Sequence, residues 1–371
     1  MNKKTLVLAI GAGLSMVAVD AAALELNPRG RVHVDYAMHD EDNSDLGDGF
    51  RARRARIGLS GKVDDDWSFQ IEYDFAENGS SANDVYLRYT GLEQGNITIG
   101  HFKVPFGLEE LTSSNNITLI ERSLPTTTFA QSRRMGVGYS TSGDNWTFAA
   151  MGFGQGQGSG VRSTTADEGQ GVGARVTFTP LNNDNNLLHL GLAASTESAA
   201  DKDAETARFR TRPESRPTNE RLVDTGNITD VSSINQFGLE AAWQSGPFSA
   251  QSEFIRASVS RSGQPSVDLD GWYVSGSWVL TGESRGYRGG VFRGVSPAGP
   301  GGAWEVTARY SDLDLDDGPV AGGEQQNWTL GVNWYANSRV RFMLNYINVN
   351  TERQGVSDNP NILLARAQVA F

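Results

Sequence analysis

Arginine is the residue type in this sequence whose number and spacing point to a chemical task. The chain contains 27 Arg but only five Lys. A guanidinium stays charged at any ordinary pH and presents a planar set of N–H donors that fits carboxylate and phosphate oxygens. We therefore expect these cations to bind or conduct oxyanions rather than to transfer protons.

The first arginine cluster lies on a candidate strand over 50–61. Its members are Arg51, Arg53, Arg54 and Arg56. Side chains alternate between the two faces of a strand, and Ile57 and Leu59 continue its apolar face. Arg54 and Arg56 are therefore expected to point to the opposite, inward face.

The second cluster consists of even-numbered positions in the segment 196–234. These are Arg208, Arg210, Arg212 and Arg216. In an extended chain they would project to one side, with ~7 Å between neighbours two residues apart. Such a row could pass an anion along a series of weak sites. The alternative is a solvated loop in which the arginines pair with Asp201, Asp203, Glu205, Glu214 and Glu220.

The chain begins with the pattern of a secretory signal peptide over 1–23. Lys3 and Lys4 precede an apolar stretch over 6–19, and three alanines at 21–23 offer a cleavage site. No later segment approaches the ~18 apolar residues of a membrane-spanning helix. We expect an exported protein whose mature domain covers 24–371.

The mature sequence has the pattern of an all-β protein. In the full chain, Gly accounts for 43 residues, Cys is absent, and hydrophobic residues make up 38%. Apolar and polar residues alternate in segment after segment, as in 326–335. Sixteen strands are predicted, over 28–38, 50–61, 67–76, 83–91, 96–104, 135–142, 145–153, 171–179, 187–195, 235–245, 248–257, 268–280, 303–311, 326–335, 339–347 and 361–371.

The connections between these strands indicate a membrane barrel. Short turns alternate with long loops, as in antiparallel outer-membrane barrels with periplasmic turns and extracellular loops. A closed barrel satisfies its backbone groups in lipid, and its polar faces can line a water-filled lumen. The predicted long loops are 39–49, 105–134, 154–170, 196–234, 312–325 and 350–360. The connection 281–302 is longer than its place in this order predicts.

Composition and missing motifs exclude several function classes. The formal charge of -12 argues against nucleic-acid binding, which needs a basic surface. The four histidines follow no metal-ligand spacing, and no H-E-x-x-H or G-x-S-x-G motif occurs. We expect neither an enzyme nor a cofactor. An outer-membrane phospholipase or protease and a soluble glycan-binding β-domain are the weaker alternatives.

The sequence resembles the phosphate-selective porin O and P family of Gram-negative outer membranes. The matching motifs occur in order along nearly the whole mature chain. They include Arg53-Arg54-Ala55, Tyr89-Thr90-Gly91, Phe106-Gly107-Leu108-Glu109, Thr112-Ser113-Ser114, Leu119-Ile120-Glu121-Arg122, Arg210-Thr211-Arg212-Pro213, Gly302-Ala303-Trp304-Glu305 and the run from Thr329 to Asn337.

This resemblance implies a homotrimer of sixteen-stranded barrels whose third loop, here 105–134, folds inward to narrow the pore. It implies constriction cations at Arg31, Arg53, Arg54 and Arg122, with Asp84 as their acidic neighbour. The arginine row leading to the constriction would contain Arg210 and Arg212, with Arg208 and Arg216 beside them. Outer-membrane lipid and lipopolysaccharide would surround the barrel.

Three positions depart from the family pattern. Glu110 stands where phosphate-selective members carry Lys, and Arg56 and Lys103 replace aromatic residues that narrow the pore. The sequence thus predicts passive diffusion of phosphate-type anions through a cationic, Arg-lined pore. The alternative is a general porin of weak selectivity, or one that prefers pyrophosphate, polyphosphate or another anion.

Overall fold

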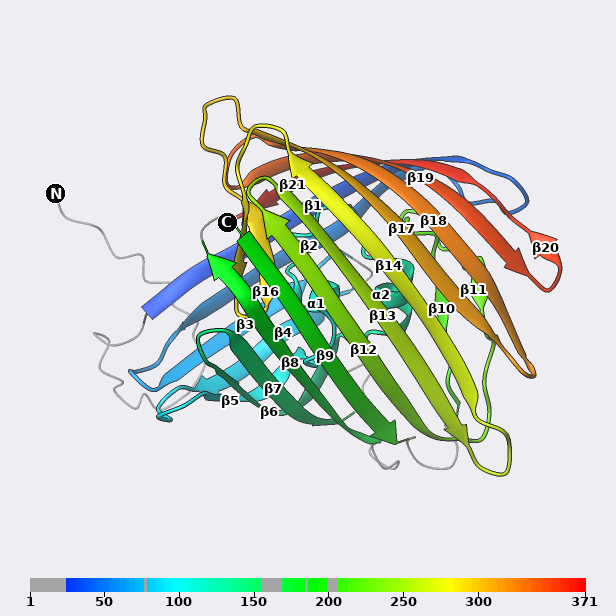
Figure 1. Cartoon of the computed structure of the whole chain (residues 1–371), viewed down its shortest axis with the longest axis horizontal. Helices are drawn as coiled ribbons and strands as arrows, with labels where there is room; N and C mark the ends of the chain where they lie inside the picture. Colours follow the sequence, from blue (N-terminus) through cyan, green and yellow to red (C-terminus); the bar gives the residue numbers. More distant parts are fainter. Residues whose placement is uncertain (1–24, 77–78, 155–168, 184–185, 199–205) are drawn as a thin grey trace.

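The computed structural model describes residues 25–76, 79–154, 169–183, 186–198 and 206–371. The expected signal peptide, 1–23, lies outside the described residues. Sixteen long strands follow one another around the barrel (Figure 1): β1 (Glu25–Asp40), β2 (Gly49–Lys62), β3 (Trp67–Asp74), β4 (Ser81–Tyr89), β5 (Asn96–Lys103), β6 (Arg133–Ser142), β7 (Trp146–Gly154), β8 (Gln170–Asn183), β9 (Asn186–Ser198), β12 (Val231–Ser245), β13 (Phe248–Arg261), β14 (Val267–Val279), β17 (Ala303–Asp317), β18 (Val320–Tyr335), β19 (Val340–Arg353) and β21 (Asn361–Ala370).

Each long strand pairs antiparallel with the next, and the last closes on the first. β21 pairs with β1 from Arg31↔Ala370 to Asp40↔Asn361. A two-residue strand, β20 (Val356–Ser357), only extends the edge of β19. The closed sheet leaves no unpaired edge, which is the condition for strands to cross hydrocarbon. The predicted sixteen-stranded antiparallel barrel is therefore confirmed.

The strand faces are reversed relative to a soluble protein. On β18, Trp328 and Leu330 are 58% and 59% exposed, whereas Asn327 and Thr329 are fully buried. On the outer face, aromatic rings of three neighbouring strands are in contact, because the Tyr310 ring centroid lies 5.3 Å from that of Trp272 and 4.8 Å from that of Trp328. Apolar and aromatic residues thus face lipid, and polar residues face the lumen.

One predicted long loop is absent. Residues 312–325 belong mostly to strands, because β17 continues to Asp317 and β18 begins at Val320. A two-residue turn joins them. The prediction was wrong because Asp312 and Asp314 occupy the outward positions beyond Tyr310, where an apolar residue was expected. A strand that extends past the hydrocarbon keeps its pairing but no longer needs apolar residues there.

The long connection 280–302 folds into the barrel as a hairpin. It contains β15 (Arg285–Arg288) and β16 (Val291–Val295), which pair with each other. The barrel wall holds this luminal hairpin through His189 Nδ1, 2.6 Å from Tyr287 Oη, and through Arg175 Nη2, which donates to Gly290 O at 2.9 Å. The hairpin enters from the end of the barrel that carries the short turns.

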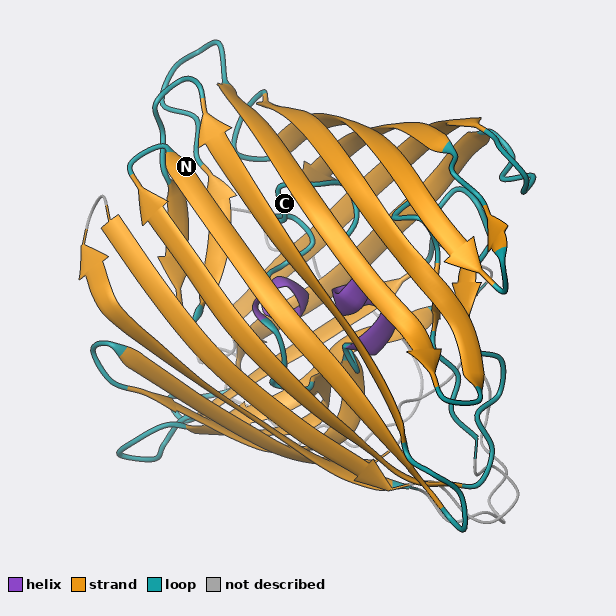
Figure 2. Ribbon diagram, turned by 45° about the vertical axis from the view of Figure 1, so that its right-hand side comes forward, coloured by secondary structure: helices purple, strands orange, loops and turns teal. Residues whose placement is uncertain are grey.

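The connection between β5 and β6 also lies in the lumen (Figure 2). This constriction loop, residues 104–132, contains α1 (Leu108–Leu111) and α2 (Leu124–Phe129). Lumen-facing side chains from across the barrel bind its backbone: Gln236 Nε2 donates to Phe129 O at 2.7 Å and Arg341 Nη1 donates to Ile117 O at 2.9 Å. The loop therefore divides the lumen at mid-height. Among the described residues, no helix is long and apolar enough to cross a membrane.

Candidate functional site

A cavity of about 590 Å³ lies between the constriction loop and the wall formed by β1 to β5. We call it the central cavity. Its lining contains two acidic residues, Asp84 and Glu110. Ten basic residues line it: Arg29, Arg31, Arg53, Arg54, Arg56, Arg88, Lys103, Arg122, Arg133 and Arg293. A chain with a net charge of -12 thus concentrates positive charge in a cavity of its lumen.

A β-bulge places two adjacent arginines in this cavity. Consecutive strand residues point to opposite faces, so Arg53 and Arg54 could not both face the lumen in a regular strand. The register of β1 with β2 shifts here, from His33↔Arg54 to Val34↔Ala52, so that Arg53 is the extra residue of the bulge. An extra residue of this kind redirects a side chain. Both guanidiniums consequently line the central cavity.

Carboxylates pair with several of the predicted constriction cations. Arg53 makes two hydrogen bonds to Glu121, of 2.7 and 3.1 Å, from the wall to the constriction loop. Arg31 Nη2 lies 3.1 Å from a carboxylate oxygen of Glu72. The Arg31 guanidinium also donates to Ser114 Oγ at 3.1 Å. These contacts hold the two arginines in place, and the carboxylates neutralise part of their positive charge.

The predicted pore cations Arg56 and Lys103 are also paired with carboxylates. Arg56 Nε lies 2.7 Å from Asp74, which belongs to the neighbouring strand β3. Lys103 Nζ lies 3.1 Å from Glu110. Arg56 and Lys103 therefore occupy space in the cavity wall, but their carboxylate partners neutralise part of their positive charge.

Glu110 sits between two cations. Its carboxylate lies 3.1 Å from Lys103 Nζ and 3.2 Å from Arg122 Nε. Burial alone would raise the pKa of the Glu110 carboxyl, but Arg122 and Lys103 outweigh burial and lower it to about 2. Glu110 is thus an anion at all physiological pH values and neutralises part of the constriction.

We expect Glu110→Gln to increase anion selectivity. The amide keeps the size of the side chain and releases Lys103 and Arg122 from one negative charge. A change of one charge near the path alters the energy of an anion by roughly 1 kcal/mol, or about fivefold in occupancy. Reversal potentials in a salt gradient measure this change.

The wild-type porin, measured at several pH values, is a control for that prediction. Because the pKa of Glu110 is about 2, acidification from pH 7 to about pH 4 leaves this carboxylate charged. Its contribution to selectivity and stability should be lost only as the pH falls toward 2. A Glu110→Gln porin with unchanged reversal potential would show that this carboxylate lies away from the ion path.

The predicted acidic residue Asp84 pairs with a cation that the sequence prediction omitted. Arg133 Nε and Nη2 donate to the two Asp84 oxygens at 2.9 and 3.2 Å. Arg133 begins β6, directly after the constriction loop. Asp84 therefore fixes the end of the loop to β4 and neutralises a basic residue of the cavity.

Four cavity arginines have no carboxylate within 4.0 Å among the described residues: Arg29, Arg54, Arg88 and Arg293. Arg54 Nη1 lies 3.3 Å from His33 Nδ1, and Arg88 Nε donates to Thr98 Oγ1 at 3.1 Å. Neutral partners orient a guanidinium without cancelling its charge. These four residues therefore contribute most of the uncompensated positive field.

Of these four, the sequence prediction named only Arg54. Strand alternation could have found Arg29 and Arg88, because Arg29 shares a face with Arg31 and Arg88 alternates with the outward Leu87. Arg293 carries no such signal, since its place in the lumen depends on the inward fold of the luminal hairpin.

The second arginine cluster lies on the side of the constriction loop that faces the long loops. Arg210, Arg212 and Arg216 line a cavity of about 130 Å³ together with Arg221. Arg208 is not part of that lining. Its guanidinium pairs with Asp224 through two nitrogens, and Nε lies 2.7 Å from the carboxylate. Burial alone would raise the pKa of Asp224, but the hydrogen bond from Arg208 lowers it below its usual value.

The extended row predicted for this cluster is only partly present. Only β10 (Arg210–Thr211) is a strand there, paired with β11 (Val223–Asp224). Arg216 reaches the same cavity through a turn. Of the acidic partners suggested for a solvated loop, Asp201, Asp203 and Glu205 lie outside the described residues, and Glu214 pairs with Arg309 instead, at 2.6 Å.

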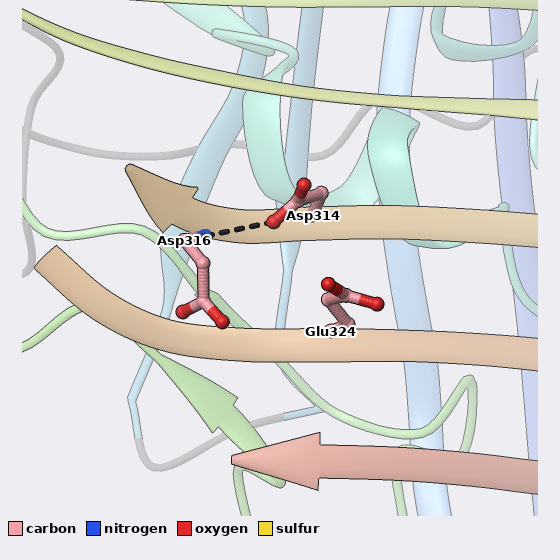
Figure 3. Close-up of side chains that lie close together, drawn as sticks. All are labelled: Asp314, Asp316 and Glu324. Atoms are coloured by element: carbon pink, nitrogen blue, oxygen red, sulfur yellow. Dashed lines mark hydrogen bonds between the residues drawn. The ribbon is translucent and has the colours of Figure 1, made fainter. Parts of the chain in front are cut away.

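A compact acidic group stands outside the pore (Figure 3). The carboxylate oxygens of Asp314, Asp316 and Glu324 lie within 4.8 Å of one another. Asp314 is paired across the strands with Glu324 and shares the face of β17 that carries the outward Tyr310. The group therefore faces away from the lumen and takes no part in the central cavity.

Comparison with known proteins identifies the family. The family model described as phosphate-selective porin O and P matches residues 26–371. The chain belongs to this porin family. This porin is 28% identical to Porin O of Pseudomonas aeruginosa over 92% of its own chain and 87% of that protein. It is 30% identical to an uncharacterized protein of Caulobacter vibrioides over 86% of its chain and 67% of that protein.

Solved structures show the same fold at low identity. The anion-selective porin from Comamonas acidovorans has a TM-score of 0.62 at 14% identity, with 94% of this porin and 100% of that chain covered. The outer-membrane channel DcaP of Acinetobacter baumannii gives 0.60 at 15% identity, with 95% and 99% covered. The predicted family, barrel and outer-membrane location are confirmed, and the protein is a channel-forming porin.

Proposed function

We propose that this porin conducts phosphate-type anions selectively and passively across the outer membrane. The observation that carries the proposal is the lining of the central cavity, with ten basic residues against two acidic ones in an acidic protein. A constriction with low-dielectric walls focuses the field of the residues that line it, whatever the net charge of the chain. The family's description as phosphate-selective supports the same substrate class.

An anion entering from the long-loop side would first meet Arg210, Arg212 and Arg216. It would then reach Arg54 and Arg31 at the constriction loop, where Ser113 and Ser114 add hydroxyl groups. Several weak sites in series allow an ion to enter and leave, whereas one tight site would trap it. No covalent step and no cofactor are needed for this transport.

The proposed assembly is a homotrimer embedded in outer-membrane lipid and lipopolysaccharide, with the short turns toward the periplasm. The strands β3 to β7 form a run of short strands with 8 to 10 residues each, whereas β12 to β19 include strands of 13 to 16. A low wall of this kind suits contact with a second barrel rather than with a full lipid bilayer. Chemical cross-linking of purified porin would report the assembly.

Weak selectivity is the second candidate, and the ion pairs favour it. Six of the ten basic residues of the central cavity are bound to carboxylates, including Arg53, Arg56 and Lys103. A general porin would result if the four remaining arginines were too few to exclude cations. Pyrophosphate or polyphosphate selectivity would result if the cavity favoured longer anions.

Planar-bilayer recordings separate these candidates. We expect the reversal potential in a KCl gradient to lie near that of chloride, and we expect added phosphate to block the chloride current. The matched comparison is block by sulfate, measured at a pH at which phosphate carries the same charge. A difference between the two anions then reports recognition of the anion itself rather than of its charge. A reversal potential near that of potassium, or chloride current unaffected by phosphate, would contradict the proposal.

A further inference from the structure

A cavity of about 620 Å³ adjoins the central cavity toward the short-turn end of the barrel. We call it the side cavity. It lies between the luminal hairpin and the wall formed by β4 to β8, and its lining reaches the two short turns 90–95 and 143–145. A solute in the pore meets both cavities, because they share five lining residues: Arg88, Phe102, Lys103, Leu111 and Arg293.

Apolar side chains from three separate elements line the side cavity. Phe102 lies on β5, Leu111 is the last residue of α1, and Val291 is the first residue of β16. Each of the three is only partly buried, so apolar surface remains in contact with the water of the pore. Covering such surface with an apolar group is favourable, whereas an inorganic anion has no apolar group with which to cover it.

An arginine stands beside this apolar surface. The Arg88 guanidinium carbon lies 4.9 Å from the centre of the Tyr86 ring, and the Tyr86 ring centroid lies 6.1 Å from that of Phe102. Arg88 Nε donates to a neutral partner, Thr98 Oγ1, at 3.1 Å. The other donors of the guanidinium fork suit the two oxygens of a carboxylate. A cation and an apolar surface are thus separated by a single aromatic ring.

We propose that the side cavity binds organic carboxylates with an aromatic body, of the size of benzoate or larger. The carboxylate binds to the Arg88 guanidinium, and the aromatic ring lies against Phe102, Leu111 and Val291. Binding there goes beyond the proposed function, because it requires that small solutes enter the lumen but requires no preference for phosphate.

Two glycines at close approaches fix the shape of the site. A Cβ added at Gly138 would lie 3.0 Å from the Phe102 ring, so this ring packs directly on the backbone of β6. A Cβ added at Gly290 would lie 3.0 Å from the Arg175 guanidinium, and Arg175 Nη2 donates to Gly290 O at 2.9 Å. Because Gly290 directly precedes Val291, the hairpin side of the cavity is held against the barrel wall. A surface that is preorganised in this way lowers the cost of binding.

The volume and the lining of the side cavity favour aromatic acids over small inorganic anions. Small-molecule sites commonly measure about 300–1,000 Å³, so a cavity of about 620 Å³ has room for an acid with one or two rings. A bound ring can pack on Phe102 in the offset or edge-to-face geometry that aromatic pairs prefer. Acetate carries the same charge as benzoate but has no ring. The difference in affinity between these two anions therefore measures the apolar half of the site.

Block of the chloride current by benzoate and by acetate tests the side cavity. We expect benzoate to block the wild-type channel at about tenfold lower concentration than acetate, because only benzoate covers the apolar surface. Val291→Thr combined with Leu111→Asn replaces apolar atoms by polar ones in side chains of similar shape. The pair should weaken benzoate block about tenfold and change acetate block by less than about twofold. Arg88→Gln should also weaken benzoate block, because it removes the cation that binds the carboxylate.

Val356→Thr is the matched control, and Val291→Ile tests for a packing defect of the hairpin. Val356 lies on β20, is 61% exposed and is outside the linings of both cavities. Val291→Ile keeps the apolar surface and should retain benzoate block. Equal block of the wild-type channel by benzoate and acetate would overturn the site, as would equal benzoate block in the double variant and the Val356→Thr porin. A chloride current that phosphate does not block would instead overturn the proposed function and leave the benzoate-to-acetate ratio readable.

Discussion

Arg54→Glu is expected to abolish the anion preference of the channel. Arg54 is 2% exposed, lines the central cavity and has a neutral partner, His33, instead of an acid. The substitution changes the local charge by two. At roughly 1 kcal/mol per charge, the occupancy of the constriction by an anion should fall about thirtyfold. The reversal potential in a KCl gradient should move from the chloride side toward the potassium side.

Arg51→Glu is the control for this experiment. It makes the same change of charge on the same strand, three residues away, at a position outside the lining of the central cavity. A general effect of acidity near the pore would shift both variants equally. If the two reversal potentials coincide, the field is not focused at Arg54 and the assignment of the constriction is wrong.

The barrel could be predicted from the sequence because lipid imposes a simple rule. Outward positions such as Trp328 and Leu330 must be apolar, and their neighbours face water, so alternation marks each strand. The rule applies only within the hydrocarbon. It failed for 312–325, where the strands continue beyond the lipid and outward positions such as Asp314 are acidic. Strand existence was therefore predictable, and strand length was not.

Several basic residues that line the central cavity were predictable from the sequence, but the ion pairs that they make were not. The sequence and its family resemblance indicated Arg53 and Arg54 together, although regular alternation would have separated them; the β-bulge that reconciles the two is a tertiary feature. Which arginines remain unpaired depends on contacts between segments far apart in the chain. Glu121, for example, reaches Arg53 across 68 positions. No local pattern carries that information.

The inward position of the constriction loop depends on a buried charge cluster around Arg309. This guanidinium is 2% exposed on β17 and lies 3.1 Å from Glu109 and 2.6 Å from Glu214. Glu109 accepts two hydrogen bonds from Ser123, at 3.0 and 2.8 Å. Glu214 accepts from Leu124 N at 3.1 Å. One arginine thus joins the constriction loop and the arginine-bearing loop to the barrel wall.

Arg309→Met should therefore destabilise the barrel and release the loop. The variant leaves Glu109 and Glu214 buried without their cation, and removal of one partner from a buried ion pair costs about 3–5 kcal/mol. Guanidinium-induced unfolding in detergent, followed by tryptophan fluorescence, measures the loss of stability. Single-channel conductance should rise and become noisier, because the constriction loop no longer keeps one position.

A charge-neutral triple variant distinguishes this mechanism from a simple packing defect. Arg309→Met combined with Glu109→Gln and Glu214→Gln removes all three buried charges and keeps side chains of similar size. Because neutral replacement of a whole buried ion cluster can be nearly free of energetic cost, stability should recover largely.

Arg256→Ala, which breaks the half-exposed pair with Asp268, is the surface control and should cost only about 0–1 kcal/mol of stability. If the single and triple variants are equally unstable and equally conductive, the loop is held by packing, and the anchoring role of Arg309 is wrong.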